Sequence, residues 1–440
     1  AARPCGTIAF LSGSARPRRM SNQRWLAGFA ALCLGQFLGH QTALTFSGLI
    51  PILRDDWRLS ASQAGFILGA FQFGQLGAYV TVGFLLDRLR SKPIMQASAA
   101  LVGLADLLFA FGARGFSSAF LLRLLTGILL GGLYLPALKH IADTTPGLRR
   151  GLTTGIYIAV VVAAYAAPLF YIGILAPRVG WRPTMAAVGV LELLGALVMA
   201  RVPEAPRPAA PERAGFARYL RDVLGNRAAF RVILAYTAHN WELFGMWTWV
   251  GPFMVTALSV RGSSRADALA WGGILAAVII GVGGGIGAVA GGRLSDRLGR
   301  ARAATLMLKV GLLCSLTFGW LLHAPLALIV AVGMLYGITS LADSPSYAAT
   351  LMEVVPPHSL GGAFSVQMLF GWTATAVAPV TFGVMLDLIK APQLGPAAPW
   401  GAAFGILALG PLVGILALAP LQGGVPAGTR RAPERDREPA

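Results

Sequence analysis

The sequence predicts an all-α integral membrane protein with twelve transmembrane helices in two pseudo-symmetric halves of six. Only 12% of its 440 residues are charged and 56% are hydrophobic, whereas soluble domains carry about 25% charged residues. Apolar runs recur along the chain, and about 20 such residues form a helix that crosses ~30 Å of hydrocarbon. A charged loop also returns 209 positions after its first copy, which indicates an internal duplication.

The apolar segments divide evenly between the two halves of the chain. The first half, residues 25–201, has segments at 25–50, 62–86, 94–112, 118–142, 151–175 and 182–201. The second half, residues 230–420, has segments at 230–258, 267–292, 303–322, 326–353, 361–388 and 400–420. Residues 202–229 are polar and proline-rich, with a basic amphipathic stretch at 216–227, so we expect a central loop with a surface helix.

The basic residues indicate the orientation in the membrane. Loops and tails on the side of both chain ends hold 25 Lys and Arg residues, those on the other side hold 8, and three lie within spans. Positive loops stay in the cytoplasm, so we expect both tails, residues 1–24 and 421–440, to be cytoplasmic in a multi-pass protein of the cell (inner) membrane. Met20 is an alternative start of translation.

The net charge and the cysteines argue against a nucleic-acid partner and against a metal or redox site. The net charge of +18 would indicate a nucleic-acid partner in a soluble protein, but here the bases lie in loops, so we expect none. The three cysteines are scattered and form no CxxC pair. We therefore expect no metal site, no disulfide framework and no cofactor.

The repeated loop places an acid beside bases twice. A juxtamembrane basic patch explains the arginines but not an aspartate at the same place in both copies. Other matches follow in the same order at nearly the same offset, 133–136 with 342–345 and 167–168 with 378–379. The matching loop residues are Gly83, Asp87 and Arg88 in the first copy, and Gly292, Asp296, Arg297 and Arg300 in the second.

These loops resemble the signature Gly-x-x-x-Asp-Arg-x-Gly-Arg of the major facilitator superfamily (MFS), and Arg123-x-x-x-Gly127 resembles its helix 4 motif. The first copy departs from the pattern, because Arg90 stands where the signature has glycine. The resemblance implies a secondary transporter that works by alternating access. It also implies that Asp87 and Asp296 latch the halves shut on the cytoplasmic side by facing helix N-termini, which attract acids. The stretch from 342–345 through Pro379 and Asp387 loosely resembles bacterial cyanate porters.

Ionisable residues inside spans mark candidate sites. Asp106 and Arg123 each lie six residues from the outer end of a span, roughly 9 Å deep by helical rise. We expect an ion pair that either staples two helices or frees Arg123 to meet an anion. We expect Glu192 in the sixth span to have a structural role, by pairing with another side chain.

The seventh span carries a second candidate group near mid-depth. His239 and Glu242 share a helix face at i, i+3 spacing, and Trp247 follows. We expect protonated His239 to pair with Glu242, which would carry a coupled proton; a buried pair with only a structural role is the alternative. In the resemblance, spans 1, 4, 7 and 10 line the cavity. This adds Gln36, His40, Gln41, Tyr134 and Asp343 as substrate or coupling candidates.

The function most consistent with these features is secondary transport of a small solute, with proton-coupled uptake of a small organic anion ahead of export of drugs or metabolites. No nucleotide-binding or hydrolase motif is present, so we expect neither ATP use nor an enzyme. A non-transporting membrane sensor is the alternative of a different class, although the central loop is short for a signalling domain. We expect a monomer whose partners are its solute, the lipid bilayer and H⁺.

Overall fold

The computed structural model describes residues 22–86, 88–145, 147–205, 221, 223, 225–356, 359–389 and 395–423. All regular structure in these residues is helical. The first group comprises α1 (Asn22–Gly39), α2 (Thr45–Trp57), α3 (Ala61–Leu86), α4 (Ser91–Gly112), α5 (Phe116–Thr144), α6 (Gly147–Val179) and α7 (Trp181–Met199). The second comprises α9 (Arg227–Ser259), α10 (Arg265–Ala277), η1 (Val278–Gly283), α11 (Gly284–Leu298), α12 (Arg300–Thr317), η2 (Phe318–His323), α13 (Leu326–Ala342), α14 (Ser344–Val354), α15 (Leu360–Leu388), α16 (Ala398–Leu407), α17 (Leu409–Leu418) and η5 (Ala419–Leu421).

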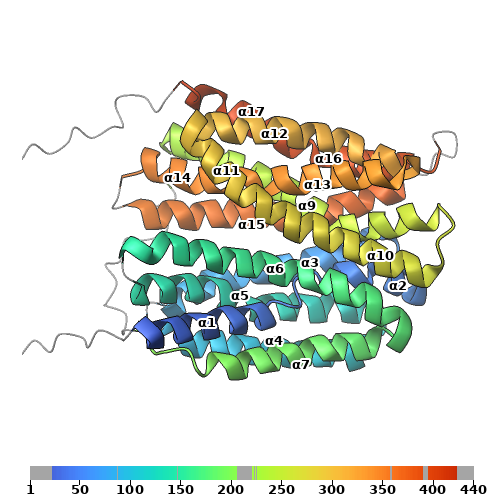
Figure 1. Cartoon of the computed structure of the whole chain (residues 1–440), viewed down its shortest axis with the longest axis horizontal. Helices are drawn as coiled ribbons and strands as arrows, with labels where there is room; N and C mark the ends of the chain where they lie inside the picture. Colours follow the sequence, from blue (N-terminus) through green and yellow to red (C-terminus); the bar gives the residue numbers. More distant parts are fainter. Residues whose placement is uncertain are drawn as a thin grey trace, which may run out of the picture.

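The helices form two bundles that lie side by side. Helices α1–α7 make one half and α9–α17 the other, with their axes running roughly along the length of the molecule (Figure 1). The beginning of α1 and the end of α17 lie at the same end of the bundle. We call this the terminal end, and the opposite end the distal end.

Several crossings consist of more than one helix. Treating α1–α2, α10–η1–α11, α12–η2, α13–α14 and α16–α17–η5 as single crossings gives the twelve that the sequence predicts. Ten of these are long and apolar enough to span a membrane by length and composition. The other two are the first crossing, which is interrupted at residues 40–44, and α9, which carries several polar and charged side chains. The predicted all-α membrane fold is therefore confirmed.

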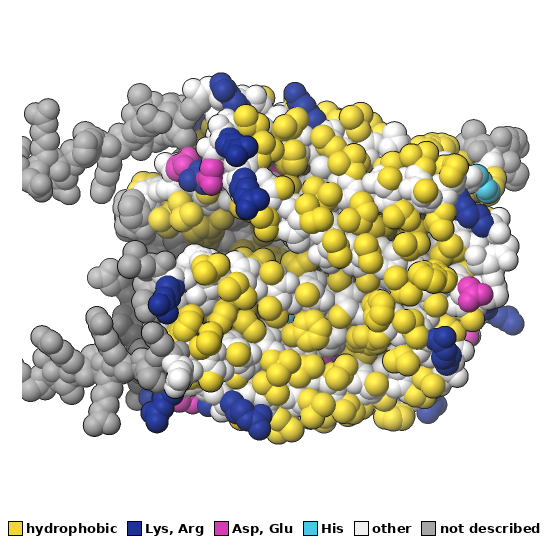
Figure 2. Space-filling view, viewed as in Figure 1, with side chains coloured by type: hydrophobic (Ala, Val, Ile, Leu, Met, Phe, Trp, Pro, Cys, Tyr) yellow, Lys and Arg dark blue, Asp and Glu magenta, His cyan; other side chains and the backbone are white. Residues whose placement is uncertain are grey.

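The surface matches a membrane environment. Hydrophobic side chains cover the middle of the face in Figure 2, whereas Lys and Arg side chains lie toward its two ends. Large apolar side chains such as Phe111 (70% exposed) and Leu121 (62% exposed) stand on the outside of the bundle. Contiguous exposed apolar surface of this kind suits contact with lipid.

The two halves meet along a seam in which α3 packs against α15 and α6 packs against α10. Glycines bring the backbones together there. A Cβ at Gly69 would lie 2.6 Å from the carbonyl oxygen of Ala376, and one at Gly173 would lie 2.5 Å from that of Leu269. Side chains at these positions would hold the halves apart, so the close seam depends on their absence.

Polar contacts close the seam at the distal end. The Asp387 carboxylate of α15 accepts hydrogen bonds from the backbone N–H of Ala61 (3.1 Å) and Ser62 (2.7 Å) and from the Ser62 hydroxyl (2.6 Å), all at the start of α3. Arg265 also pairs with Asp55 at 2.8 Å. At the terminal end, by contrast, Figure 2 shows a hollow between the described parts of the two halves. In the residues that the structure describes, the seam is therefore closed distally and open at the terminal end.

Candidate functional site

Three predicted site residues, all buried, lie in the last turn of α1 and in the interruption that follows it: Gln36, His40 and Gln41. His40 Nδ1 lies 2.9 Å from the carbonyl oxygen of Gln36, and Gln41 Nε2 donates to that of Phe37 at 2.6 Å. The Gln36 carbonyl oxygen also accepts the His40 backbone N–H at 3.1 Å, so both side chains bond to backbone carbonyl groups in the last turn of α1. His40 Nε2 has no hydrogen-bond partner among the described residues, which leaves one polar atom of this segment for a ligand.

Asp106 and Arg123 lie in one buried cluster between α4 and α5. Arg123 Nη1 is 3.9 Å from Asp106 Oδ1, and the guanidinium stacks 4.2 Å from the centre of the Phe71 ring. The closer contacts of Arg123 are with Thr42 in the interrupted segment. Arg123 is 1% exposed, so in this state it stabilises the helix interruption and is not open to the hollow.

Glu192 of α7 belongs to the same cluster. Its Oε1 accepts the backbone N–H of Thr42 at 2.9 Å, and its carboxyl group lies within hydrogen-bonding reach of that of Asp106. The structural role expected for Glu192 is therefore combined with direct contact to a candidate site residue. Sequence spacing did not indicate this contact, because Glu192 is 86 positions from Asp106 in the chain.

A second buried cluster joins α9 to the junction of α13 and α14. His239 Nδ1 lies 2.9 Å from Asp343 Oδ1, and His239 Nε2 lies 2.9 Å from the Ser344 hydroxyl. The Tyr347 hydroxyl donates to Asp343 Oδ2 at 2.7 Å. His239 and Asp343 are each 2% exposed, and their contact is the only ion pair that either residue forms among the described residues.

The expected pairing of His239 with Glu242 is wrong in this structure. Glu242 accepts a hydrogen bond from the Ser315 hydroxyl at 2.9 Å and lies against Gly311, both on α12. Positions i and i+3 of a helix are about 60° apart around its axis. This difference suffices to direct His239 to α14 and Glu242 to α12.

Aromatic side chains from both halves meet at mid-depth. We name Tyr79, Tyr165, Phe244, Trp247 and Trp372 the aromatic cluster. Ring centres of Tyr79 and Trp372 are 4.9 Å apart, those of Tyr165 and Trp247 6.1 Å, and Phe244 lies 5.7 Å from both tryptophans. The His40 ring is 6.0 Å from Tyr165, so the cluster connects the first crossing to α3, α6, α9 and α15.

Polar atoms in and beside the aromatic cluster lack partners. Tyr79 Oη, Trp247 Nε1 and His40 Nε2 are buried and make no hydrogen bond to any described residue. Buried polar atoms nearly always have a partner, so these three mark where a solute or water would bind. The sequence predicted only His40 and Trp247; the available signal for Tyr79 was a polar-tipped aromatic inside an apolar span.

The remaining wall candidates support neighbouring helices. Tyr134 stacks on Tyr157 with ring centres 5.9 Å apart, and the Tyr157 hydroxyl donates to Gln36 Oε1 at 3.3 Å. Gln36 also donates to the sulfur of Met95. These contacts hold the first crossing against α4, α5 and α6, and the substrate-binding role of Tyr134 stays a prediction.

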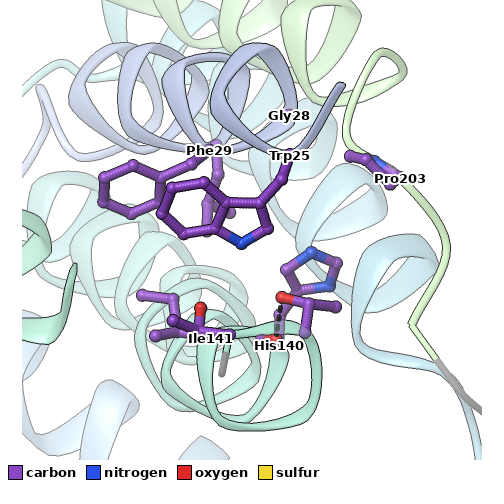
Figure 3. Close-up of a pocket in the computed structure, with 9 residues that line it drawn as sticks. Trp25, Gly28, Phe29, His140, Ile141 and Pro203 are labelled. Carbon is purple, nitrogen blue, oxygen red and sulfur yellow. Dashed lines mark hydrogen bonds between the residues drawn. The ribbon is translucent and has the colours of Figure 1, made fainter. Parts of the chain in front are cut away.

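A small pocket lies within the first half at the terminal end, away from the seam. It is lined by Trp25 and Phe29 of α1, by His140 and Ile141 of α5, and by Pro203 (Figure 3). None of its lining residues belongs to the aromatic cluster, so we do not include it in the solute site.

The proposed latch is only partly described. Asp87 lies outside the described residues. The side chains of Arg88 and Arg297, beside Gly83 and Gly292 in the two loops, form no ion pair or hydrogen bond with another described residue. Asp296 is exposed and has no ion pair or hydrogen bond to any described residue. Arg300 instead pairs with Glu353 of α14 at 2.5 Å, within its own half. The latch stays a prediction, and an unengaged Asp296 accords with a molecule open at the terminal end.

Comparisons with known proteins identify the family. The chain is 27% identical over 423 residues to a gallate transporter of Pseudomonas putida, covering 89% of this chain and 93% of that protein. It is 29% identical over 344 residues to the 3-(3-hydroxy-phenyl)propionate transporter of Escherichia coli K12, covering 74% and 81%. The crystal structure of a D-xylose–proton symporter shares the fold, with a TM-score of 0.71 at 16% identity over 90% of this chain and 97% of that one. The model of the Major Facilitator Superfamily matches residues 32–379, and the chain therefore belongs to that family of membrane transporters.

Proposed function

We propose that this protein takes up a small organic anion together with protons, by alternating access between its two halves. The observation that carries the proposal is the aromatic cluster at mid-depth, which draws on both halves and holds unpaired polar atoms. Solute sites of such transporters lie near the bilayer midplane between the halves. With both tails cytoplasmic, the hollow at the terminal end would open to the cytoplasm.

The solute class follows from the chemistry of this cluster. Aromatic faces bind flat apolar groups, and the free Trp247 Nε1 and Tyr79 Oη supply donors for carboxylate or hydroxyl oxygens. Two relatives are named for aromatic acids, gallate and 3-(3-hydroxy-phenyl)propionate, which supports the same class here. We therefore propose a carboxylate with a planar ring as the solute.

The coupled proton is assigned to the pair of His239 and Asp343 rather than to Glu242. A proton on the imidazole gives a buried ion pair, and its loss leaves a carboxylate that Tyr347 still hydrogen-bonds. His239 of this pair lies one to two helical turns before Phe244 on α9, roughly 7 Å along the helix axis. The position of the pair at the junction of α13 and α14 would link proton release to movement of α14.

The test uses purified protein in liposomes with a panel of benzoates, uronates and sulfonates. Asp343→Asn should abolish accumulation driven by a pH gradient while retaining exchange of labelled solute for unlabelled solute. Glu242→Gln is the matched control, since it also removes a buried acid of the second half, and it should retain both activities. If Glu242→Gln loses coupling and Asp343→Asn keeps it, the proton assignment fails. Binding without any exchange would instead support a sensor.

A further inference from the structure

We propose that Asp106 and Glu192 share one resident proton, and that this proton fixes the interruption of the first crossing beside His40. The inference does not depend on which solute is carried or on where the coupled proton binds. It rests on the hydrogen bonds of Thr42, on the balance of charges in the cluster and on two carboxyl oxygens that lack donors.

Thr42 is bound through every polar atom it has. Its N–H donates to Glu192 Oε1 at 2.9 Å, its carbonyl oxygen accepts from Arg123 Nη2 at 3.1 Å, and its hydroxyl oxygen accepts from Arg123 Nη1 at 2.6 Å. The Thr42 carbonyl oxygen also accepts the Thr45 backbone N–H at 3.2 Å, whereas the Thr42 N–H would face an apolar interior without Glu192. Side chains of α5 and α7 thus supply hydrogen-bond partners to the backbone at the interruption.

The charges of the cluster do not balance unless one acid is protonated. It contains two carboxyl groups, those of Asp106 and Glu192, and one guanidinium group, that of Arg123. Tyr171 of α6 is the other titratable group that interacts electrostatically with the two acids. Asp106 and Glu192 are 0% exposed and Arg123 is 1% exposed. Two ionised acids would leave an uncompensated negative charge in a dry site, and neighbouring carboxylates disfavour joint ionisation.

The unpaired oxygens point to where the proton lies. Thr126 donates to Asp106 Oδ1 at 3.3 Å and Thr42 donates to Glu192 Oε1. Asp106 Oδ2 and Glu192 Oε2 are buried and receive no hydrogen bond from any described donor. The two carboxyl groups lie within hydrogen-bonding reach of each other, so a proton on one can be donated to the other, and it makes the cluster electrically neutral. It also ties α4 to α7 next to the interruption.

Amide substitutions test the proposal because glutamine imitates a protonated glutamate. Glu192→Gln should keep the acceptor for Thr42 and a donor for Asp106, so its Tm should stay within about 2 °C of wild type. The infrared C=O band of a protonated carboxylic acid should lose one component. Glu242→Gln is the spectral control, because it removes a different buried acid and should leave that component in place.

The double variant Asp106→Asn with Glu192→Gln should behave differently. It strands the Arg123 charge, so its Tm should fall by roughly 5–10 °C, well beyond the sum of the single variants. An infrared spectrum of Glu192→Gln identical to wild type would overturn the proposal, as would single amide variants, Asp106→Asn included, that are both as unstable as the double. A Tm that rises when Na⁺ replaces choline in the buffer would assign the site to a metal cation instead and likewise overturn it.

Discussion

Removal of the Asp387 carboxylate should open the distal end of the molecule. This side chain accepts the first two backbone N–H groups of α3 and the Ser62 hydroxyl, and it does so from the other half. Hydrogen bonds to a charged acceptor contribute roughly 1.5–3 kcal/mol, and an N-cap about 1 kcal/mol. Because Asp387 is only partly buried, we take about 2 kcal/mol for all three bonds, which is roughly a thirtyfold change in the equilibrium between distal-closed and distal-open forms.

The assay is double electron–electron resonance between spin labels on the distal ends of α2 and α10, in a background without native cysteines. Asp387→Ala should raise the distal-open population about thirtyfold relative to the distal-closed one. Asp55→Ala is the matched control: it breaks the other distal contact between the halves, but Asp55 and Arg265 are 62% and 64% exposed, and such pairs contribute little. Equal effects of the two variants, or none from Asp387→Ala, would refute the reasoning.

Two further predictions concern packing and the latch. Gly127→Ala should lower the free energy of unfolding by about 1–3 kcal/mol, because its Cβ would overlap the Phe71 carbonyl. Gly77→Ala is the control: the position has open space around it, so this variant should be neutral or slightly stabilising. Thermal denaturation of both variants checks the difference. Asp296→Asn should leave the Tm of the terminal-open form unchanged, since the acid has no partner among the described residues. The same variant should increase the labelling of thiols introduced at the terminal end. Unaltered labelling would count against the latch.

Features that depend on one segment at a time were predictable from the sequence. Apolar length and the positions of loops gave the number of crossings, because a helix in lipid must satisfy its own backbone. The interruptions at residues 40–44 and at Asp343 were not foreseen, since both lie in stretches that the sequence predicts as continuous spans. Their interruption is stabilised by distant side chains, Arg123 and Glu192 in the first case.

Partners across helices were harder to predict than the residues themselves. Helical rise indicated a similar depth for Asp106 and Arg123, and depth is a property of each segment alone. The partner of His239 depended on which neighbour each side of α9 meets, and local spacing favoured Glu242 over Asp343, 104 positions away. Trp372 and Tyr79 illustrate the same limit, because their contact exists only when α3 and α15 are packed together.

The glycine-lined seam has a mechanical consequence. Where backbones touch without interlocking side chains, one helix can roll over the other with little change in packed area. Helix α15 has 29 residues, roughly 43 Å at the usual rise. If it pivots near Asp387, a tilt of about 10° swings its Leu360 end by roughly 7 Å, enough to admit or expel a solute the size of a benzene ring. A lever of this length turns a slight rotation at the fulcrum into a full gate movement at the opposite membrane surface.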